Sequence, residues 1–303
     1  MYDLIIAGAG PAGITAAVYA ARKKMKLLVV TDDVGGQAAW SGDVENYTGY
    51  QLITGPELAA KFEEHMRTYG IPLRTGEPVT GLEKKRESVL VATAQTVYEA
   101  RTCIIATGKR TRELNVAGEK EFKNRGLTYC ATCDGPLFSG KDVAVIGGGN
   151  SGLDAVLQLM RIARHVYLIN ISGDLTGDAV MQDKARSAPN VSVLNNTRVT
   201  AVRGDRFVTE IGIQARDGSE RSLAVRGVFV EIGLIPNSEF AGEVSRNERG
   251  EIKVSAANET NLAGIFAAGD VTDVPEKQII IAAGEGSKAC LSAFHYIARN
   301  TFS

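Results

Sequence analysis

An apolar run followed by a glycine-rich turn and a helix constrains this fold more than any other sequence feature, because it occurs twice. In the first copy, residues 4–7 are the apolar run expected of a strand buried in a parallel sheet. An alanine-rich helix to about Arg22 and a second strand over residues 26–30 follow. Between the run and the helix lie the three glycines of a G-x-G-x-x-G turn: Gly8, Gly10 and Gly13.

This turn predicts a dinucleotide site. Its glycines let the chain turn tightly and allow the helix N-terminus, with Pro11 and Ala12, to approach a pyrophosphate. Asp32 follows Gly13 by 19 residues and ends the second strand, where an acid accepts a hydrogen bond from a ribose hydroxyl. The strand before the turn and the acid after it make the signal specific.

The second copy begins at residues 143–146 and continues through Gly147, Gly149 and Gly152. A helix to about Arg161 and a strand over residues 166–169 complete it. Asn150 and Ser151 are expected at the phosphate loop and helix start. A repeat of this kind predicts two similar nucleotide-binding domains.

Between the copies lies the chain's single Cys-x-x-Cys, Cys130-Ala131-Thr132-Cys133, followed by Asp134. At a helix start, free N–H groups and the helix dipole favour a thiolate, as a reversible redox pair requires. The alternatives are a zinc knuckle and two ordinary buried thiols. Zinc needs four ligands, and the chain offers only Cys103, Cys290 and three scattered histidines besides. The pattern favours the redox pair, and Cys103 and Cys290 are expected in the core.

The composition excludes several classes of protein. The net charge of -1 and pI near 6.4 do not favour nucleic acid or an anionic membrane surface. The N-terminus lacks a basic signal region and its apolar run is too short for a membrane span. Four cysteines in 303 residues are no disulfide scaffold, so we expect a cytoplasmic protein.

The rest of the chain predicts how two domains are assembled. Residues 35–37 and 43–47 are expected to be loops, and a helix is expected over 56–69 with a core stripe of Leu58, Phe62, Met66 and Tyr69. Three short strands are expected over 77–106 and three more over 198–231. A helix over 278–299, with Gly284 and Gly286 for close helix packing, is expected to return to the first domain.

The predicted fold is therefore α/β, with two Rossmann-like dinucleotide-binding domains of the three-layer ββα type. Each carries a small three-stranded β-meander. The first domain would be discontinuous, over residues 1–113 and 239–303, and the second would span 114–238.

These motifs together resemble the low-molecular-weight thioredoxin reductase family. The resemblance runs nearly end to end through the two glycine turns, Gly35-Gly36-Gln37, Ala106-Thr107-Gly108, the Cys-x-x-Cys with Asp134-Gly135, and Gly269-Asp270. Residues 274–286 and 182–184 look more like the reductase portion of the alkyl hydroperoxide reductase flavoprotein subunit. That subunit carries an additional N-terminal thioredoxin-like region, so this chain is expected to pass electrons to a separate protein.

The resemblance implies cofactors and the residues that hold them. It assigns FAD to the first domain and a nicotinamide nucleotide to the second. The expected FAD residues are Gly8, Gly10, Pro11, Ala12, Gly13, Asp32, Gly36, Gln37, Asn46, Thr107, Gly108, Gly269, Asp270, Gln278 and Ile279. The expected nicotinamide nucleotide residues are Gly147, Gly149, Asn150, Ser151, Gly152 and Asn170.

One departure from the family bears on the nucleotide. NADPH-using relatives carry a His-Arg-Arg segment where this chain has Asn170 and the residues after it, with no Arg or Lys before Lys184. A 2′-phosphate would lie beside Asp174 and Asp178 without a cation, whereas Asn170 can bond ribose hydroxyls. We therefore expect NADH in preference to NADPH.

The resemblance also implies a mechanism. Cys133 would face the flavin, Cys130 would attack the partner's disulfide, and Asp134 would be the acid–base residue. Asp134 capping the following helix is the structural alternative. The family rotates its nicotinamide domain, and hinges are expected near 109–115 and 234–240.

The partner would be a thioredoxin- or glutaredoxin-like protein or a peroxiredoxin's carrier, and the resemblance implies a homodimer. Three rivals remain open. The flavin could take electrons from ferredoxin or a deazaflavin. The same fold could serve as a dithiol oxidase that uses oxygen, or as a flavin-loaded redox sensor without turnover.

Overall fold

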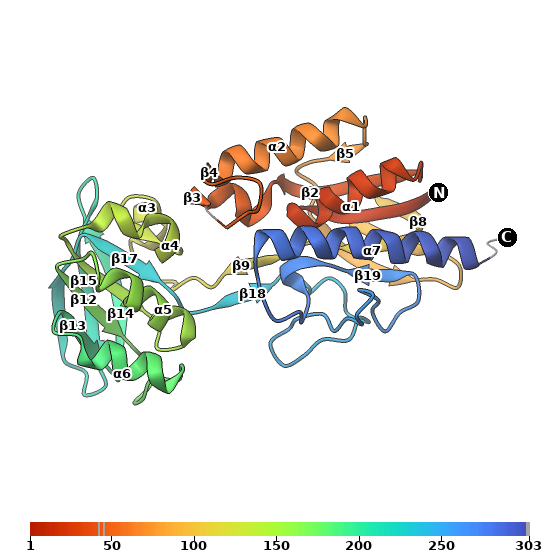
Figure 1. Ribbon diagram of the computed structural model, residues 1–303. Coiled ribbons are helices and arrows are strands. Elements are labelled where there is room, and N and C mark those ends of the chain that lie inside the picture. The colour runs from red at the N-terminus through yellow and green to blue at the C-terminus, as the bar shows by residue number, and fades with distance from the viewer. Residues whose placement is uncertain (42, 45, 301–303) are drawn as a thin grey trace. The chain divides into compact units, whose positions relative to one another are not determined.

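The chain divides into two units (Figure 1). Each unit contains one of the glycine-rich turns. The computed structural model describes residues 1–41, 43–44 and 46–300. Unit 1 comprises Met1–Arg110 with Ile235–Ser303, and unit 2 comprises Thr111–Leu234. The chain passes between the units at two points, where β9 (Lys109–Thr111) and β18 (Leu234–Pro236) pair with each other. Both points lie inside the segments expected to be hinges, and motion there stays a prediction.

Unit 1 is built on a mixed sheet with strand order β5-β2-β1-β8-β7-β6, and β19 also pairs with β8. Parallel pairing joins β5, β2, β1, β8 and β19, whereas β6, β7 and β8 form an antiparallel meander. β8 belongs to both parts, because its Ala100 pairs with Tyr2 on one side and with Val89 on the other. The strands are β1 (Tyr2–Ala9), β2 (Leu27–Val34), β5 (Leu73–Arg74), β6 (Val79–Lys84), β7 (Val89–Thr93), β8 (Val97–Ile105) and β19 (Ile265–Ala267).

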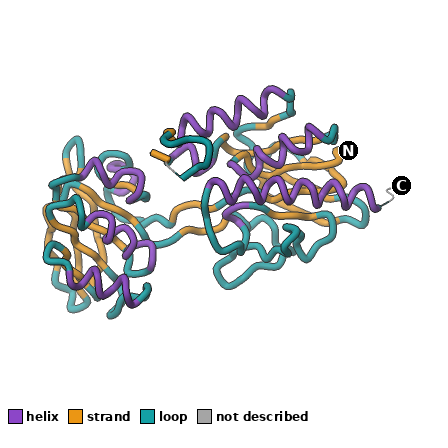
Figure 2. Tube along the Cα trace, in the orientation of Figure 1, coloured by secondary structure: helices purple, strands orange, loops and turns teal. Residues whose placement is uncertain are grey.

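Alternate residues of β1 enter different cores of unit 1. Leu4 and Ile6 are buried with α1 (Pro11–Arg22) and α7 (Ile279–Arg299), whereas Ile5 is buried with the meander and the loop that follows β18. Figure 2 shows that this segment between β18 and β19 is almost entirely loop. Helices, parallel sheet and meander therefore form the three layers that the sequence predicts.

The third helix of unit 1, α2 (Gly55–Thr68), begins at a capping box. The Thr54 hydroxyl accepts from the N–H of Glu57, and the Glu57 carboxylate accepts from the N–H of Thr54. Leu58 and Met66 are buried as expected, but Tyr69 lies past the helix end and is 38% exposed. The core stripe therefore ends at Met66.

Unit 2 repeats this plan around a parallel sheet of order β10-β17-β11-β12-β13. Val143 and Val145 of β11 pack with α5, and Ala144 and Ile146 pack with the meander β14-β15-β16. The strands are β10 (Leu127–Thr128), β11 (Asp142–Ile146), β12 (His165–Ile169), β13 (Val191–Leu194), β14 (Thr197–Gly204), β15 (Val208–Ala215), β16 (Glu220–Ala224) and β17 (Gly227–Val230). The helices are α3 (Glu119–Phe122), α4 (Ala131–Asp134), α5 (Asn150–Leu159) and α6 (Ala179–Ser187).

Two sequence predictions need correction. Four strands, not three, cover residues 198–231, because the chain leaves the meander after β16 and β17 returns beside β11. Residues 35–37 and 43–47 are not all loop: Gly36 and Gln37 begin the 3₁₀ helix η1 (Gly36–Trp40), and β3 (Asp43–Val44) pairs with β4 (Ile53–Thr54). Residue 45 lies outside the described residues.

The packing of α7 against α1 depends on one glycine. A Cβ at Gly286 would lie 2.0 Å from the carbonyl oxygen of Ala12, so only glycine permits this approach. At Gly284 a Cβ would meet nothing within 4 Å. The packing role expected for both glycines is therefore correct for Gly286 and wrong for Gly284. None of the described helices combines the length and apolarity of a membrane span.

Gly286→Val should force α7 away from α1 and lower the free energy of unfolding by about 1–3 kcal/mol. Gly284→Ala is the matched control on the same helix, and its better helix propensity should leave stability unchanged or raised by up to about 1 kcal/mol. Urea unfolding of both variants checks this. Equal losses for the two substitutions would contradict the packing argument.

Candidate functional site

The two glycine turns have the same stereochemistry. In unit 1 a Cβ at Gly8, whose φ is +105°, would lie 2.4 Å from the Ala106 carbonyl oxygen, and one at Gly13 would lie 1.9 Å from that of Gly8. A Cβ at Gly10 would meet nothing within 4 Å. The outer glycines therefore permit close packing, and the middle one leaves the open space that a pyrophosphate needs.

Unit 2 repeats each of these features. Gly147, with φ of +130°, would place a Cβ 2.2 Å from the Glu231 carbonyl oxygen, and Gly152 would place one 1.9 Å from that of Gly147. Gly149 is open, with only the Thr176 hydroxyl at 3.8 Å. Both turns thus fit a dinucleotide.

The longer helices differ in how their N-termini are capped. Among described helices of nine residues or more, α2 and α6 have side-chain caps, from Thr54 and Asp178. The helices α1, α5 and α7 begin at Gly10, Gly149 and Gln278 without a side-chain cap. A helix start without a side-chain cap keeps N–H groups and the positive end of the dipole available to an anion. These are the three helices that the sequence assigns to cofactors.

Several expected FAD residues meet around the start of α1. A Cβ at Gly36 would lie 3.4 Å from Gly10 Cα, and one at Gly269 would lie 3.0 Å from Ala12 Cβ. Pro11 occupies the first turn of α1, where its missing N–H costs nothing. The sequence predicted these residues separately, and the fold brings them together.

A second contact joins the segment before β4 to α7. Asn46 Nδ2 donates to Gln278 Oε1 at 3.0 Å, across 232 residues of sequence. Ile279, the next residue, packs beside Val44, Ile53 and Leu58. The start of α7 is thereby fixed beside the segment that precedes α2.

Gln37 and Thr107 form hydrogen bonds with residues beside the Gly108 turn and with the segment after β18. Gln37 Nε2 donates to the Lys109 carbonyl oxygen at 2.8 Å, directly after Gly108, whose φ is +63°. The Thr107 hydroxyl donates to the Asn237 carbonyl oxygen at 2.6 Å, and Asn237 Nδ2 returns a bond to the Thr107 carbonyl. Asn237 was not among the predicted site residues.

Asp270 is largely buried beside two lysines. Burial raises the pKa of its carboxyl group, and attraction to Lys277 and Lys109 opposes that rise. Such a carboxyl group can exchange hydrogen bonds with the hydroxyls of a ligand.

The expected ribose acid is less well placed than its neighbours. β2 continues to Val34, so Asp32 lies inside the strand, exposed, and not at the strand's end as predicted. Thr31, which the sequence did not single out, is buried; its hydroxyl accepts from Ala9 N at 3.2 Å and donates to the Asp33 carbonyl at 2.6 Å. Burial, and then repulsion from Asp32, raise the pKa of Asp33.

The redox turn lies in unit 2, where Cys130 directly precedes the short helix α4, as expected. Cys130 is disulfide-bonded, and its N–H donates to the Thr128 hydroxyl oxygen at 3.2 Å. That hydroxyl donates to the Asp134 carboxylate. The side chain of Cys133 lies outside the described part of the chain. Asp134 provides no side-chain cap to the 3₁₀ helix η2 (Gly135–Phe138), so the capping alternative is wrong.

Glu231 is a second carboxyl group beside this turn, and the sequence did not reveal it. Its Oε1 accepts from the N–H of Ala131, the residue after Cys130, at 3.4 Å. Burial raises the pKa of Glu231 to about 7, the Ala131 N–H opposes the rise, and the Asp154 carboxylate adds to it. Only its position after the last strand of the unit could have pointed to it.

The predicted nucleotide residues of unit 2 have mixed outcomes. Asn150 Oδ1 accepts from Asp178 N at 2.7 Å and so ties the start of α5 to the segment before α6, and Ser151 is exposed. Asn170 is buried, and its Nδ2 donates to Ser172 O, Asp174 O and Asn195 Oδ1. Both of its N–H groups are therefore engaged within the protein.

Asp134 also lines a cavity of about 620 Å³ in unit 2. Lys141 and Arg226 add positive charge to its lining, and Leu137 and Phe207 are 68% and 55% exposed. A hollow with apolar side chains beside an acid and two cations suits a protein surface segment.

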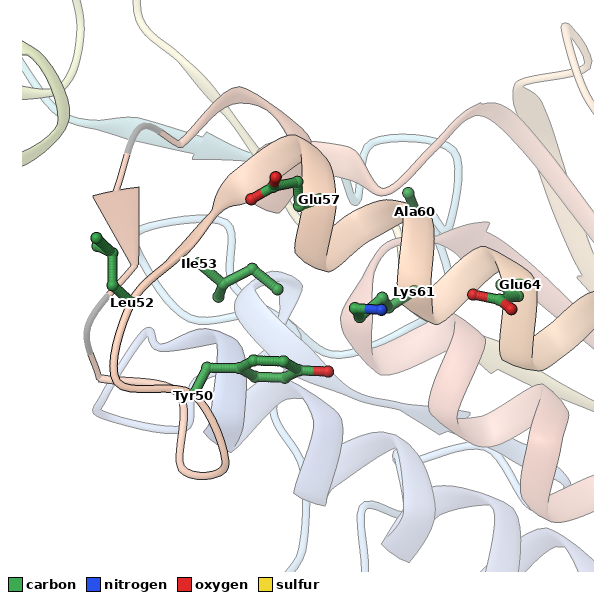
Figure 3. Close-up of a pocket in the computed structure, with 7 residues that line it drawn as sticks. All are labelled: Tyr50, Leu52, Ile53, Glu57, Ala60, Lys61 and Glu64. Carbon is green, nitrogen blue, oxygen red and sulfur yellow. The ribbon is translucent and has the colours of Figure 1, made fainter.

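A second hollow and the two remaining cysteines include none of the predicted site residues. A hollow of about 420 Å³ is lined by Tyr50, Leu52 and Ile53 and by the α2 residues Glu57, Ala60, Lys61 and Glu64. Figure 3 shows these side chains. Cys103 and Cys290 are free, buried core thiols, as expected, and burial raises the pKa of each to about 12. Across the described residues no His, Cys, Asp and Glu side chains gather as metal ligands would.

Comparisons with known proteins agree with this geometry. Residues 2–286 match the pyridine nucleotide-disulphide oxidoreductase family. The chain is similar to a Bacillus subtilis NADH dehydrogenase (44% identity over 301 residues, 99% of this chain and 59% of that protein). It is also similar to a subunit of the Staphylococcus aureus alkyl hydroperoxide reductase (45% over 304 residues, 99% and 60%). It therefore spans about 60% of the length of these relatives.

A solved structure matches over nearly the whole length. The thioredoxin reductase from Streptococcus pyogenes superimposes with a TM-score of 0.84 and 34% identity, covering 99% of each chain. The predicted α/β fold is confirmed by this likeness.

Glu231→Gln should change the pH dependence of stability. The pKa of Glu231 is near 7 in the folded protein and near the ordinary 4.5 in the unfolded chain, so the folded protein binds this proton more tightly. The contribution of Glu231 to the free energy of unfolding is therefore complete below pH 4.5 and is lost as the pH rises through 7. The uncharged Gln avoids this loss and should make the variant more stable than the native protein at pH 8, by about 3 kcal/mol at most.

Urea unfolding at pH 5 and pH 8 measures this, with the exposed Glu121→Gln of the same unit as control. An advantage of the Glu231 variant that is the same at both pH values would contradict the linkage.

Proposed function

Because the chain belongs to the pyridine nucleotide-disulphide oxidoreductase family, we propose that it is a flavin-dependent disulfide reductase. Unit 1 would bind FAD and unit 2 would bind NADH. Electrons would leave through Cys130 and Cys133 to a thioredoxin- or glutaredoxin-like protein. The observation that carries this proposal is the pair of stereochemically matching glycine turns, one of which shares its unit with the disulfide-bonded Cys130.

In unit 1 the residues around α1 would hold FAD. The N–H groups at the start of α1 would bind the pyrophosphate over the open face of Gly10, and Asp270 would bond ligand hydroxyls. The start of α7, beside Asn46 and Gln278, would face the flavin ring. When bound, FAD would accept a hydride and pass its two electrons to the disulfide.

In unit 2 the start of α5 would bind the nucleotide pyrophosphate above Gly149. The exposed segment after Asn170 offers carboxylates in place of cations: Asp174 is exposed, and Asp178 caps α6. A 2′-phosphate would meet repulsion there, which supports NADH. Because Asn170 engages its N–H groups within the protein, ribose would be bonded chiefly by other groups.

The disulfide chemistry follows from the redox turn. Once two electrons have reduced the pair, the Cys130 thiolate would attack a disulfide sulfur of the partner, and the departing sulfur would take a proton from Asp134. Cys133 would then give its proton to Asp134 and attack the Cys130 sulfur as a thiolate. The second partner sulfur would leave and take a proton from solvent, which releases the partner as a dithiol and restores the Cys130–Cys133 disulfide. The Thr128 hydroxyl donates to Asp134 and accepts from the Cys130 N–H, so it would fix the position of the acid relative to the nucleophile. The cavity beside Asp134 would admit the partner.

A second candidate keeps the flavin and disulfide but takes electrons from a donor other than a nicotinamide nucleotide. The engaged side chain of Asn170 favours it, because it removes one predicted ribose contact. The open Gly149 and the uncapped α5 favour the nicotinamide nucleotide.

Anaerobic titration of the FAD-loaded protein with NADH, and separately with NADPH, tests the function. NADH should bleach the flavin, and the native chain should consume one further hydride equivalent that Cys133→Ser does not. Oxidised thioredoxin added to the reduced native protein should return it to the oxidised state.

The other outcomes of the titration would contradict separate parts of the proposal. Bleaching by NADPH alone would contradict the preference for NADH. A flavin that neither nucleotide reduces would favour the second candidate. Equal uptake by the native chain and Cys133→Ser would exclude the disulfide from the relay.

A further inference from the structure

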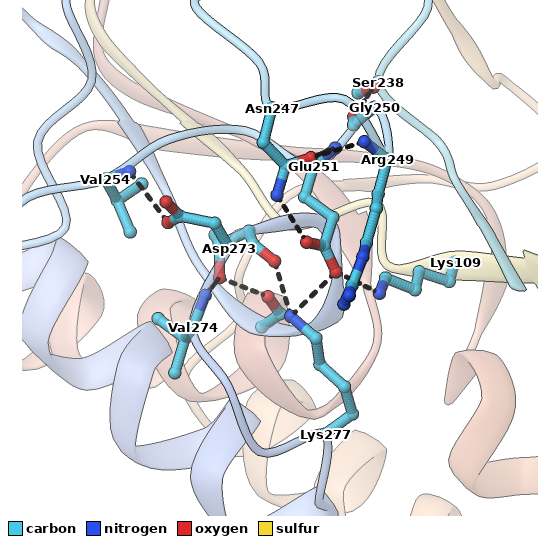
Figure 4. Close-up of polar contacts among 12 residues, drawn as sticks. Lys109, Ser238, Asn247, Arg249, Gly250, Glu251, Val254, Asp273, Val274 and Lys277 are labelled. Atoms are coloured by element: carbon cyan, nitrogen blue, oxygen red, sulfur yellow. Dashed lines mark hydrogen bonds and ion pairs between the residues drawn. The ribbon is translucent and has the colours of Figure 1, made fainter. Parts of the chain in front are cut away.

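Two largely buried lysines share one glutamate in unit 1, close to residues assigned to the flavin (Figure 4). Glu251 Oε1 accepts from Lys109 Nζ at 2.6 Å and lies 3.5 Å from Lys277 Nζ. The side chains of Lys109 and Glu251 are each 9% exposed, and that of Lys277 is 20% exposed. We call these three residues the lysine cluster.

Neighbouring groups hold the cluster in one arrangement. Asn247 Nδ2 donates to Glu251 Oε2 at 2.6 Å, and Asn247 Oδ1 accepts from the N–H of Glu251 at 3.0 Å. Lys277 Nζ donates to the Thr272 carbonyl oxygen, and Asp273 accepts from Val254 N at 3.1 Å. The glutamate and both ammonium groups therefore have defined positions.

The charges of the cluster are not those of an isolated ion pair. For Glu251 burial acts to raise the pKa, but hydrogen bonds from Lys109 and Asn247 outweigh it and lower the pKa. Burial, followed by repulsion from Lys109, lowers the pKa of Lys277, and attraction to Glu251 and Asp270 opposes this. Two cations thus share Glu251, and both also attract the Asp270 carboxylate.

Stability alone is a weak reason for this arrangement. Desolvating charged groups costs several kcal/mol per ion, and apolar replacements of buried ion pairs are often no less stable. A buried cluster with two cations is better explained by a ligand that gains negative charge.

The cluster is continuous with the proposed flavin site. Lys109 follows Gly108, and its carbonyl oxygen accepts from Gln37. Lys277 directly precedes Gln278, the residue at which α7 begins and which bonds Asn46. Both lysines attract the Asp270 carboxylate.

We propose that the lysine cluster sets the reduction potential of the flavin, an inference that rests on the proposed function. A hydride carries two electrons and one proton, so a neutral flavin that accepts one gains a negative charge. Lys109 and Lys277 stabilise that charge, and Glu251 fixes both lysines and offsets part of their field. In a buried site such charges act through a low effective dielectric. These are positioning and electrostatic residues, and they take no part in bond making.

The test is the midpoint potential of bound FAD, measured anaerobically against a reference dye, in the full-length chain. Lys277→Met removes a cation and should weaken binding of reduced relative to oxidised FAD about tenfold, a fall of about 30 mV for a two-electron couple. Lys277→Arg keeps the cation and should retain the native potential. Lys85→Met, at an exposed pair with Glu83, is the matched control and should also leave it unchanged.

Glu251→Gln separates electrostatics from loosening. It removes an anion, so the potential should rise, opposite in sign to Lys277→Met. A structural role alone would shift both variants in the same direction. An unchanged or lowered potential for Glu251→Gln, or equal shifts for Lys277→Met and Lys277→Arg, would overturn the proposal. If Glu251→Gln does not fold, the two Lys277 variants decide.

The two proposals fail in distinguishable ways. A native chain that binds no FAD contradicts the proposed function, and this inference falls with it. A native chain that binds FAD, with a potential that Lys277→Met does not move, contradicts the lysine cluster's role alone.

Discussion

The close approach of backbone to backbone at glycine is the constraint on which both units depend. Gly13 lies against Gly8 and Gly286 lies against Ala12, so α1 is held tightly between its strand and α7. This packing brings the uncapped starts of α1 and α7 into one unit, together with the turns at Gly36 and Gly269. A side chain at Gly13 or Gly286 would separate these elements. The fold thus collects, through close packing, helix dipoles and N–H groups that are best satisfied by an anionic ligand.

Unit 2 repeats the glycine packing but adds the groups that a disulfide reaction needs. The Cys130 turn follows β10 and is fixed by Thr128, which bonds the Cys130 N–H and the Asp134 carboxylate. Glu231 follows β17, the strand beside β10, and so lies within reach of the N–H of Ala131. Two carboxyl groups therefore accept hydrogen bonds at the turn, and in unit 1 two lysines attract Asp270. In each unit, charged side chains would therefore lie close to the groups whose charge would change in the proposed reaction: the flavin in unit 1 and the disulfide in unit 2.

Local sequence patterns predicted the fold well, because glycine turns and buried strands are determined by residues that are adjacent in the sequence. The α/β class, the two glycine turns and the long C-terminal helix were all predictable. Long-range strand pairing was not predictable. After β16 the chain leaves the meander, and β17 pairs with β11, but no local pattern near residues 225–226 indicates this change.

Among site residues, motifs led to Gly10 and Cys130 but missed Thr31, Asn237 and Glu231, whose roles come from contacts distant in sequence. Asn170 was read as a ribose ligand from its position, whereas the structure engages its N–H groups internally. The roles of the predicted site residues stay predictions.

The most direct measurement is the redox state of each cysteine after anaerobic addition of NADH to the FAD-loaded protein. Free thiols would be alkylated under denaturing conditions before and after NADH and located by mass spectrometry. If electrons pass from the nicotinamide through the flavin to the disulfide, Cys103 and Cys290 should be labelled in both samples, and Cys130 and Cys133 should gain label only after NADH. A flavin that bleaches while Cys130 and Cys133 stay unlabelled would contradict the relay from nicotinamide through flavin to disulfide.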